Sequence, residues 1–235
     1  MASLIFNKES MASPFTIFFF FLFFFGLIFL FAFVQVGLIT LAFEKIGLGP
    51  NQVFAFLLLS LLGSYINIPI KKIENRQELP FYPERITFFG ISYNIPQWTT
   101  TQTIVAINLG GAVIPILLSI YLMLKWHIFF EPVVATSLVA VISYFLAKPV
   151  PGLGIAMPIF IPPLLAAIVA LALSKSGHAP AVAYIAGTIG TLIGADILHL
   201  KDIHKLKSPI VSIGGAGTFD GIFLAGVIAV LLTHY

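Results

Sequence analysis

The chain has 235 residues, of which 59% are hydrophobic and 9% are charged, and its mean hydropathy is +1.06. Globular proteins average about 45–50% apolar and about 25% charged residues, so this composition excludes a soluble enzyme, a disordered chain and a large extramembrane domain. The net charge of +3 does not indicate a nucleic-acid partner, because Lys and Arg mainly orient membrane proteins, and the absence of Cys excludes disulfides and thiolate chemistry.

Charge-free runs predict an all-α membrane helix bundle of about seven transmembrane helices, forming a single domain over residues 1–235. The first run, rich in Phe, is too long for the apolar core of a cleaved signal peptide, so we expect a retained helix, with Met11 as an alternative start. The predicted helices cover roughly residues 14–40, 50–70, 103–124, 128–147, 156–174, 180–199 and 215–234.

Two long connections are expected on one side of the membrane. Residues 71–101 form a long cytoplasmic loop, and Arg85–Ile95 within it is β-prone, which predicts a short interfacial hairpin with a turn at Gly90. Residues 200–218 form a second cytoplasmic loop that ends in a re-entrant, Gly-rich segment.

The distribution of basic residues predicts the orientation. With seven spans, nine Lys and Arg residues fall on one side and three, Lys45, Lys125 and Lys175, on the other, which together make the 12 in the chain. Because basic residues concentrate in cytoplasmic loops, we expect a cytoplasmic N-terminus and an external C-terminus.

Two acidic residues are predicted to lie inside the bilayer. Asp196 is five residues inward from Lys201, about 7 Å along a helix. Only 16 residues run from Asp220 to the end, about 24 Å, which is too short for a core of about 30 Å, so Asp220 also lies below the surface. Buried acids cost about 2.5–3.5 kcal/mol each on insertion scales, so two at matched depth are expected to share a proton or bind something. The alternative is that each caps a helix end or pairs with a loop lysine.

The segment before Asp220 contains Gly214, Gly215, Gly217 and Thr218. Because glycine has no side chain, we expect the backbone of this segment to come close to a ligand and to bind a peptide by strand addition. The alternative is a plain turn that begins the last helix. Asn67 and Asn108 fall at the same depth, which suggests a hydrated cavity open to the cytoplasm. On the predicted sixth helix, Gly187, Gly190 and Gly194 form a ridge for close helix packing, and Asp196 points away from it.

Two resemblances follow from these segments. Asn108–Gly111, Ala181–Asp196 and Ile213–Gly226 resemble an uncharacterised family of prokaryotic polytopic membrane proteins, which implies a multi-pass protein of the prokaryotic plasma membrane. The last two helices resemble intramembrane aspartyl proteases such as presenilin and signal peptide peptidase, which carry an Asp in one helix and Gly-x-Gly-Asp opening a later one. Here Thr218 and Phe219 separate Gly217 from Asp220.

The protease resemblance implies that Asp196 and Asp220 are a catalytic pair that cuts a membrane-embedded peptide, without a cofactor. The glycine segment would hold the substrate, with Asn108 and Asn67 nearby. The alternative is a proton- or ion-coupled transporter or channel that uses the same acids. A third hypothesis is a metal site, for which the candidate ligands are Asp196, His199, Asp202 and His204. The expected partners are membrane lipids and a transmembrane peptide.

Overall fold

The computed structural model describes residues 14–74, 84–88, 91–95, 102–152, 154–174, 177–206, 208–215 and 218–234. Contacts divide the chain into two compact units, Met1–Thr40 and Leu41–Tyr235. Helix α1 (Pro14–Lys45) supplies the described residues of the first unit, and its last residues, from Leu41 on, are assigned to the second unit.

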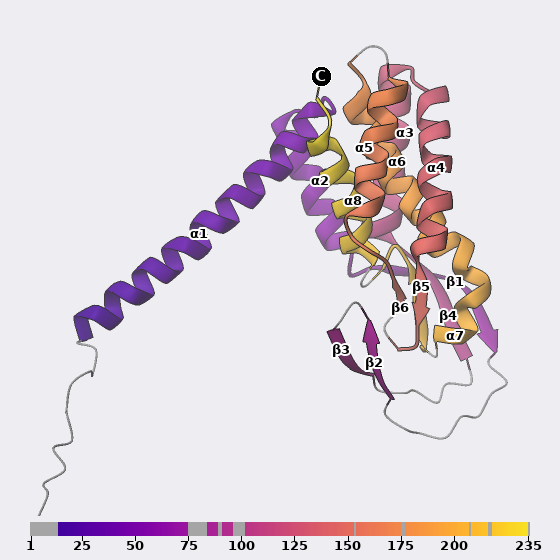
Figure 1. The fold of residues 1–235 in the computed structure, drawn as a ribbon, viewed down its shortest axis with the longest axis horizontal. Coiled ribbons are helices and arrows are strands. Elements are labelled where there is room, and N and C mark those ends of the chain that lie inside the picture. The colour runs from indigo at the N-terminus through magenta and orange to yellow at the C-terminus, as the bar shows by residue number, and fades with distance from the viewer. Residues whose placement is uncertain are drawn as a thin grey trace, which may run out of the picture. The chain divides into compact units, whose positions relative to one another are not determined.

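The second unit is a helical bundle built around one central helix. Its longer helices are α2 (Pro50–Gly63), α3 (Ile114–Trp126), α4 (Phe130–Leu146), α5 (Ile161–Leu173), α6 (Ala179–Thr191) and α8 (Thr218–Leu232) (Figure 1). Helix α6 contacts α3, α4, α5 and α8, and nearly all of its residues are buried. Alanines and glycines along α6 allow its neighbours to approach closely, so this helix forms the core of the bundle.

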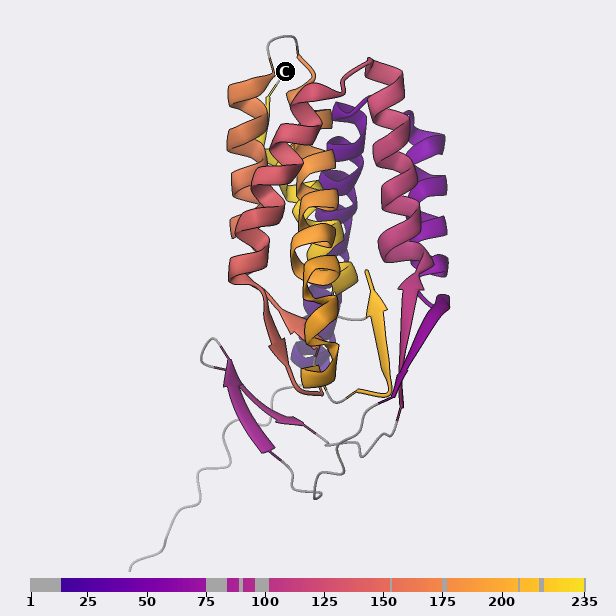
Figure 2. The same ribbon diagram turned by 90° about the vertical axis from the view of Figure 1, so that its right-hand side faces the viewer.

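In the described part of the chain, three short β-sheets accompany the helices. The largest has the order β1-β4-β7, from β1 (Asn67–Glu74), β4 (Gln102–Asn108) and β7 (Ile210–Ile213). Strand β4 is antiparallel to β1 and parallel to β7. The two-stranded sheets are β2 (Glu84–Phe88) with β3 (Ile91–Ile95), and β5 (Lys148–Val150) with β6 (Gly154–Ala156). Two views agree that β1, β4, β5 and β6 lie at one end of the bundle (Figures 1 and 2).

Two helices lose regular α-helical geometry at that same end. A π-helical turn, η1 (Leu109–Val113), leads from β4 into α3, and a second, η2 (Leu192–Asp196), follows α6. The chain then continues as a 3₁₀ helix, η3 (Ile197–Asp202), and the short helix α7 (Ile203–Leu206). Such π-turns often mark functional sites.

The predicted helix boundaries were wrong at this end. The predicted helix over residues 50–70 ends at Gly63 and is followed by β1, and the one over residues 103–124 begins with β4. Both strand segments contain several β-branched residues, and a charge-free apolar run does not by itself distinguish a strand from a helix. The all-α class is therefore corrected to a mainly helical fold with a small β component.

Three further boundaries moved. Helix α5 begins at Ile161, because β6 takes up Gly154–Ala156 and Pro162 and Pro163 suit the first turn of a helix. The predicted 180–199 helix continues irregularly to Asp202, and the 200–218 connection contains α7 and β7.

The predicted hairpin was confirmed, and of the predicted spans the structure confirms only the presence of apolar helices. The β-prone stretch forms the antiparallel pair β2–β3, in which Phe88 faces Ile91, while Gly90 lies outside the described residues. Among the described residues, three helical stretches are long and apolar enough to cross a membrane: Phe21–Lys45, Leu109–Trp126 and Ala179–Asp202. Four shorter apolar helices accompany them, Pro50–Gly63, Phe130–Leu146, Ile161–Leu173 and Gly221–Leu232.

Candidate functional site

Asp196 is buried at the sheet end of the bundle and binds the residue that follows β7. Its side chain is 4% exposed, and a carboxylate oxygen accepts a hydrogen bond of 2.7 Å from the Gly214 backbone N–H. This contact is neither of the two ordinary roles considered from the sequence, a helix cap or a lysine pair. It fixes the end of a strand to the π-turn that carries the acid.

Gly214 is required for that contact. Its φ is +67°, and a Cβ there would lie 2.7 Å from the Gly111 carbonyl carbon and 2.8 Å from Ala112. Only glycine adopts this conformation without strain and fits against η1. The chain therefore turns at Gly214, directly after β7, and the Gly214 N–H points toward Asp196.

The π-turn η2 is held from the other side by α4. A Cβ at Gly194 would lie 2.3 Å from the Ala140 carbonyl oxygen, so the two backbones are in close contact. The His199 ring forms a hydrogen bond of 3.1 Å between Nδ1 and the Gly194 carbonyl, and it lies against the Tyr144 ring with centroids 4.8 Å apart and the ring planes tilted by 36°. These contacts fix the backbone that carries Asp196.

Asp196 lies beside the outer edge of β7, which is the edge that points away from β4. The Pro209 carbonyl accepts a bond of 2.9 Å from the Ile104 N–H of β4. Because successive residues of a strand direct their backbone groups to opposite edges, Ile210, Ser212 and Gly214 direct theirs away from β4. Two bonds agree with this: Ser208 Oγ donates to the Ile210 carbonyl, and the Gly214 N–H donates to Asp196.

Asn67 and Asn108 form a polar cluster that joins three segments. Asn108 caps η1 by accepting a bond from the Gly111 N–H, and its amide donates to the Ser64 carbonyl and to Asn67 Oδ1. The Ser212 hydroxyl donates to the same Asn67 oxygen. The cluster therefore connects the starts of β1 and η1 to the middle of β7.

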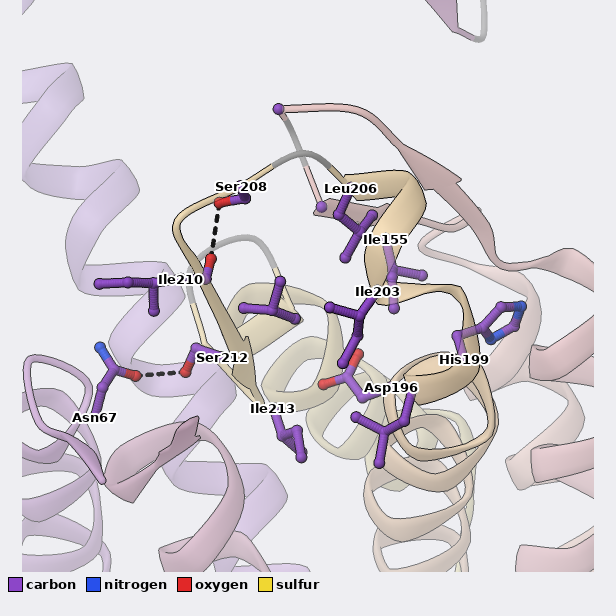
Figure 3. Close-up of a pocket in the computed structure, with 14 residues that line it drawn as sticks. Asn67, Ile155, Asp196, His199, Ile203, Leu206, Ser208, Ile210, Ser212 and Ile213 are labelled. Carbon is purple, nitrogen blue, oxygen red and sulfur yellow. Dashed lines mark hydrogen bonds between the residues drawn. The ribbon is translucent and has the colours of Figure 1, made fainter. Parts of the chain in front are cut away.

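A pocket of about 310 Å³ lies between β7 and the η3–α7 helix (Figure 3). Asp196 is at its base, Asn67 and Ser212 are on the β7 side, and Ile203 and Leu206 are on the helix side. The structure thus brings Asn67 and Asp196 to one cavity. Asn108 and Gly214 adjoin it through Asn67 and Asp196.

The remaining predicted residues lie where the chain turns from β7 into α8. Gly215 is buried and donates its N–H to the Ser212 carbonyl at 3.0 Å. Gly217 lies outside the described residues. Thr218 begins α8 and Asp220 is in its first turn, but their side chains lie outside the described part.

The packing of α6 on α8 gives the position of Asp220 along the bundle. A Cβ at Gly187 would lie 2.8 Å from the Ala225 carbonyl oxygen, and Leu192 and Ile222 share one buried cluster. Residue numbers rise on α6 as they fall on α8, so the helices are antiparallel. Asp196 is nine residues beyond Gly187 and Asp220 is five residues before Ala225, a difference of four residues, so their backbones lie about 6 Å apart along the helix axis.

Of the residues considered for a metal site, Asp196, His199 and Asp202 have described side chains, and these do not form a metal-binding group. Figure 3 shows the His199 ring on the side of the helix away from the Asp196 carboxylate. Among the residues that the structure describes, no group of three or more His, Asp or Glu side chains could hold a metal ion. The side chain of His204 lies outside that part.

The sequence did not identify Ser208 and Ser212 as pocket residues, although both line the pocket. A signal for the strand was present, because Ile210–Ile213 is rich in β-branched residues and stands between Pro209 and Gly214. The partners of these residues are distant in the sequence and were not predictable from the local pattern.

Comparison with known proteins gives a family and no function. A family model described as a protein of unknown function (DUF1614) matches residues 61–232, which include all of the site residues above. No curated protein matches the chain, and no solved structure does.

Proposed function

The chain belongs to the DUF1614 family, and we propose that it is an intramembrane aspartyl protease of the prokaryotic plasma membrane, with Asp196 and Asp220 as its catalytic pair. The observation that carries the proposal is a buried carboxylate, at the base of a pocket, fixed at the outer edge of a strand. That arrangement would present a peptide bond of an extended substrate directly to Asp196.

The chemistry requires two carboxyl groups that share one proton. The ionised member takes a proton from water as the water oxygen bonds to the peptide carbonyl carbon, and the protonated member donates to the carbonyl oxygen. The C–N bond of the resulting diol then breaks and the leaving nitrogen takes up a proton. One water is consumed, and a new carboxyl and a new amine are formed.

The proposed setting is a chain of seven spans with a cytoplasmic N-terminus. The distribution of basic residues and the order of the seven apolar helical segments support it. The pocket would then open to the cytoplasmic side, where water and an unwound end of a membrane-embedded peptide can meet.

The test is the cleavage of membrane-embedded peptides by the full chain in proteoliposomes. The probe is a pool of synthetic peptides, each with an apolar stretch of about 20 residues, and products are identified by mass spectrometry. We expect Asp196→Asn and Asp220→Asn each to reduce cleavage at least about a hundredfold, the scale of lost acid–base catalysis. Asparagine at 196 keeps an oxygen that can accept the Gly214 bond, so the fold should persist.

The matched control is Asp202→Asn, which removes a carboxylate from the same helical segment but outside the pocket. It should cleave like the unmodified chain. Full activity of both Asp196→Asn and Asp220→Asn would remove the proposal.

A second candidate is a proton- or ion-coupled transporter or channel. It is favoured by the π-turns η1 and η2, because transporters bind ions where membrane helices are interrupted. The same proteoliposomes discriminate the two functions: uptake of protons under an imposed gradient, lost in Asp196→Asn and without peptide cleavage, would favour transport.

A further inference from the structure

An apolar groove lies between α3 and α4, and α6 forms its floor. Both helices pack on α6, and the groove has a volume of about 370 Å³. Ile120 of α3 and Val133 of α4 line it and are 47% and 58% exposed, so the groove opens on the outer surface of the bundle. We call it the α3–α4 groove.

The α3–α4 groove is the place where the central helix reaches the surface. From Ala179 to Asp196, every residue is buried except Ile189 and Ile193, and both of these line the groove. Ile193 belongs to η2, the π-turn that ends with Asp196. Whatever fills the groove therefore contacts both α6 and the turn that carries the acid.

The lining of the groove favours an uncharged occupant without hydrogen-bonding groups. None of the eleven described residues that line it is Asp, Glu, Lys, Arg or His. The Ser119 and Ser137 hydroxyls donate to carbonyls one turn earlier on their own helices. A polar occupant would lose its bonds to water or headgroups and find no charged partner here, whereas methylene groups have no such bonds to lose.

The groove is too small for a helix or a second protein chain. It extends along α6 from Ile185 to Ile193, about 12 Å. A helix segment of that length, about 10 Å in diameter, would fill roughly 900 Å³, more than twice the volume of the groove. A stable interface with a second protein involves about 20–30 residues a side, against the eleven here. The groove therefore fits a narrow, flexible, apolar chain.

We propose that the α3–α4 groove binds one acyl chain of a membrane lipid, packed between α3 and α4 against Ile189 and Ile193. Because lipid tails are as apolar as the groove, binding gains little from the hydrophobic effect. The gain is contact, since an unfilled groove would leave its walls without dispersion partners. The inference goes beyond the proposed protease function and does not depend on it.

The test uses the full chain in phosphatidylcholine vesicles, in which some of the lipids carry a diazirine in the middle of one acyl chain. Light converts the diazirine to a carbene, and mass spectrometry of the digested protein identifies the labelled residues. We expect labels on Ile189 and Ile193 as well as on the outer surface. Labels on exposed residues such as Leu117, without any on α6, would overturn the inference.

A matched pair of variants on α3 distinguishes the groove from general contact with lipid. Ile120→Trp places an indole at the opening of the groove, whereas Leu117→Trp adds the same side chain at a 59% exposed position outside it. Because a carbene reacts only with atoms in contact, we expect Ile120→Trp to reduce labelling of Ile189 at least about fivefold relative to Leu117→Trp. Equal labelling in the two variants would contradict a bound acyl chain.

A second measurement does not require the groove to be blocked. Val133→p-benzoylphenylalanine places a photoreactive group on the wall of the groove, and Leu138→p-benzoylphenylalanine places it at an exposed position of α4 outside the groove. Both proteins are irradiated after purification in detergent, which removes lipid from the outer surface. We expect an adduct with the mass of one lipid at position 133 and none at position 138. A product with the mass of two chains, or a link to another segment of the same chain, would show a protein occupant and overturn the inference.

Discussion

Single glycines decide how closely the backbones around the site approach. The ridge predicted from Gly187, Gly190 and Gly194 does form close contacts, but with two different helices. Gly187 lies against Ala225 of α8, whereas Gly190 lies against Val139 of α4, as Gly194 does against Ala140. The spacing of the glycines along one helix predicted close packing. It did not predict that these glycines contact two different helices, which they do because α6 packs against both α4 and α8.

Gly194→Ala should destabilise the protein. The new Cβ would lie 2.3 Å from the Ala140 carbonyl oxygen, which is backbone and cannot move aside cheaply. We expect a loss of about 1–3 kcal/mol, the usual range for overpacking, measured by thermal unfolding in detergent. The control is Gly221→Ala in α8, where a Cβ meets nothing within 4 Å and stability should hold or rise. Unfolding of the two variants at the same temperature would contradict the close contact.

At the scale of elements, strands occupy one end of a helical bundle and position the site. Strand β4 ends at Asn108, the cap of η1, and β7 ends at Gly214, next to Asp196. The sequence predicted the β2–β3 hairpin, where turn and strands are adjacent in the chain. It did not predict β1, β4 and β7, because their pairing joins residues that are distant in the sequence: Glu74 pairs with Gln102, and Ile104 pairs with Ile210.

Asn108→Ala should loosen the junction of β1, η1 and β7. It removes the bond to the Gly111 N–H and both bonds donated by the Asn108 amide. Because Asn108 is 1% exposed, water cannot easily replace these bonds, and we expect a loss of about 1–3 kcal/mol in thermal unfolding. Asn51→Ala, at an exposed position of α2, is the control and should stay within about 0.5 kcal/mol. An equal effect of the two changes would mean that the cluster does not stabilise the fold.

At the scale of the whole molecule, the proposed orientation can be tested because the chain has no cysteine. Lys72→Cys and His234→Cys each introduce one thiol at an exposed position, and seven spans put them on opposite sides. In right-side-out vesicles, a membrane-impermeant maleimide should label His234→Cys at once and Lys72→Cys only after permeabilisation. Labelling of both from the same side would contradict the proposed topology.

The sequence by itself determined that this is a membrane protein, the order of its apolar helices and the identity of its buried acid at 196. These depend on composition and on local runs of residues, which are present in the chain before it folds. Only the tertiary structure decided that the edge of strand β7 lies beside Asp196 and that Ser212 donates a hydrogen bond to Asn67. The same is true of the pocket that Asn67, Ser212 and Asp196 line together. Strand pairing and cavity shape depend on contacts between distant segments, and local periodicity carries no information on which segments meet.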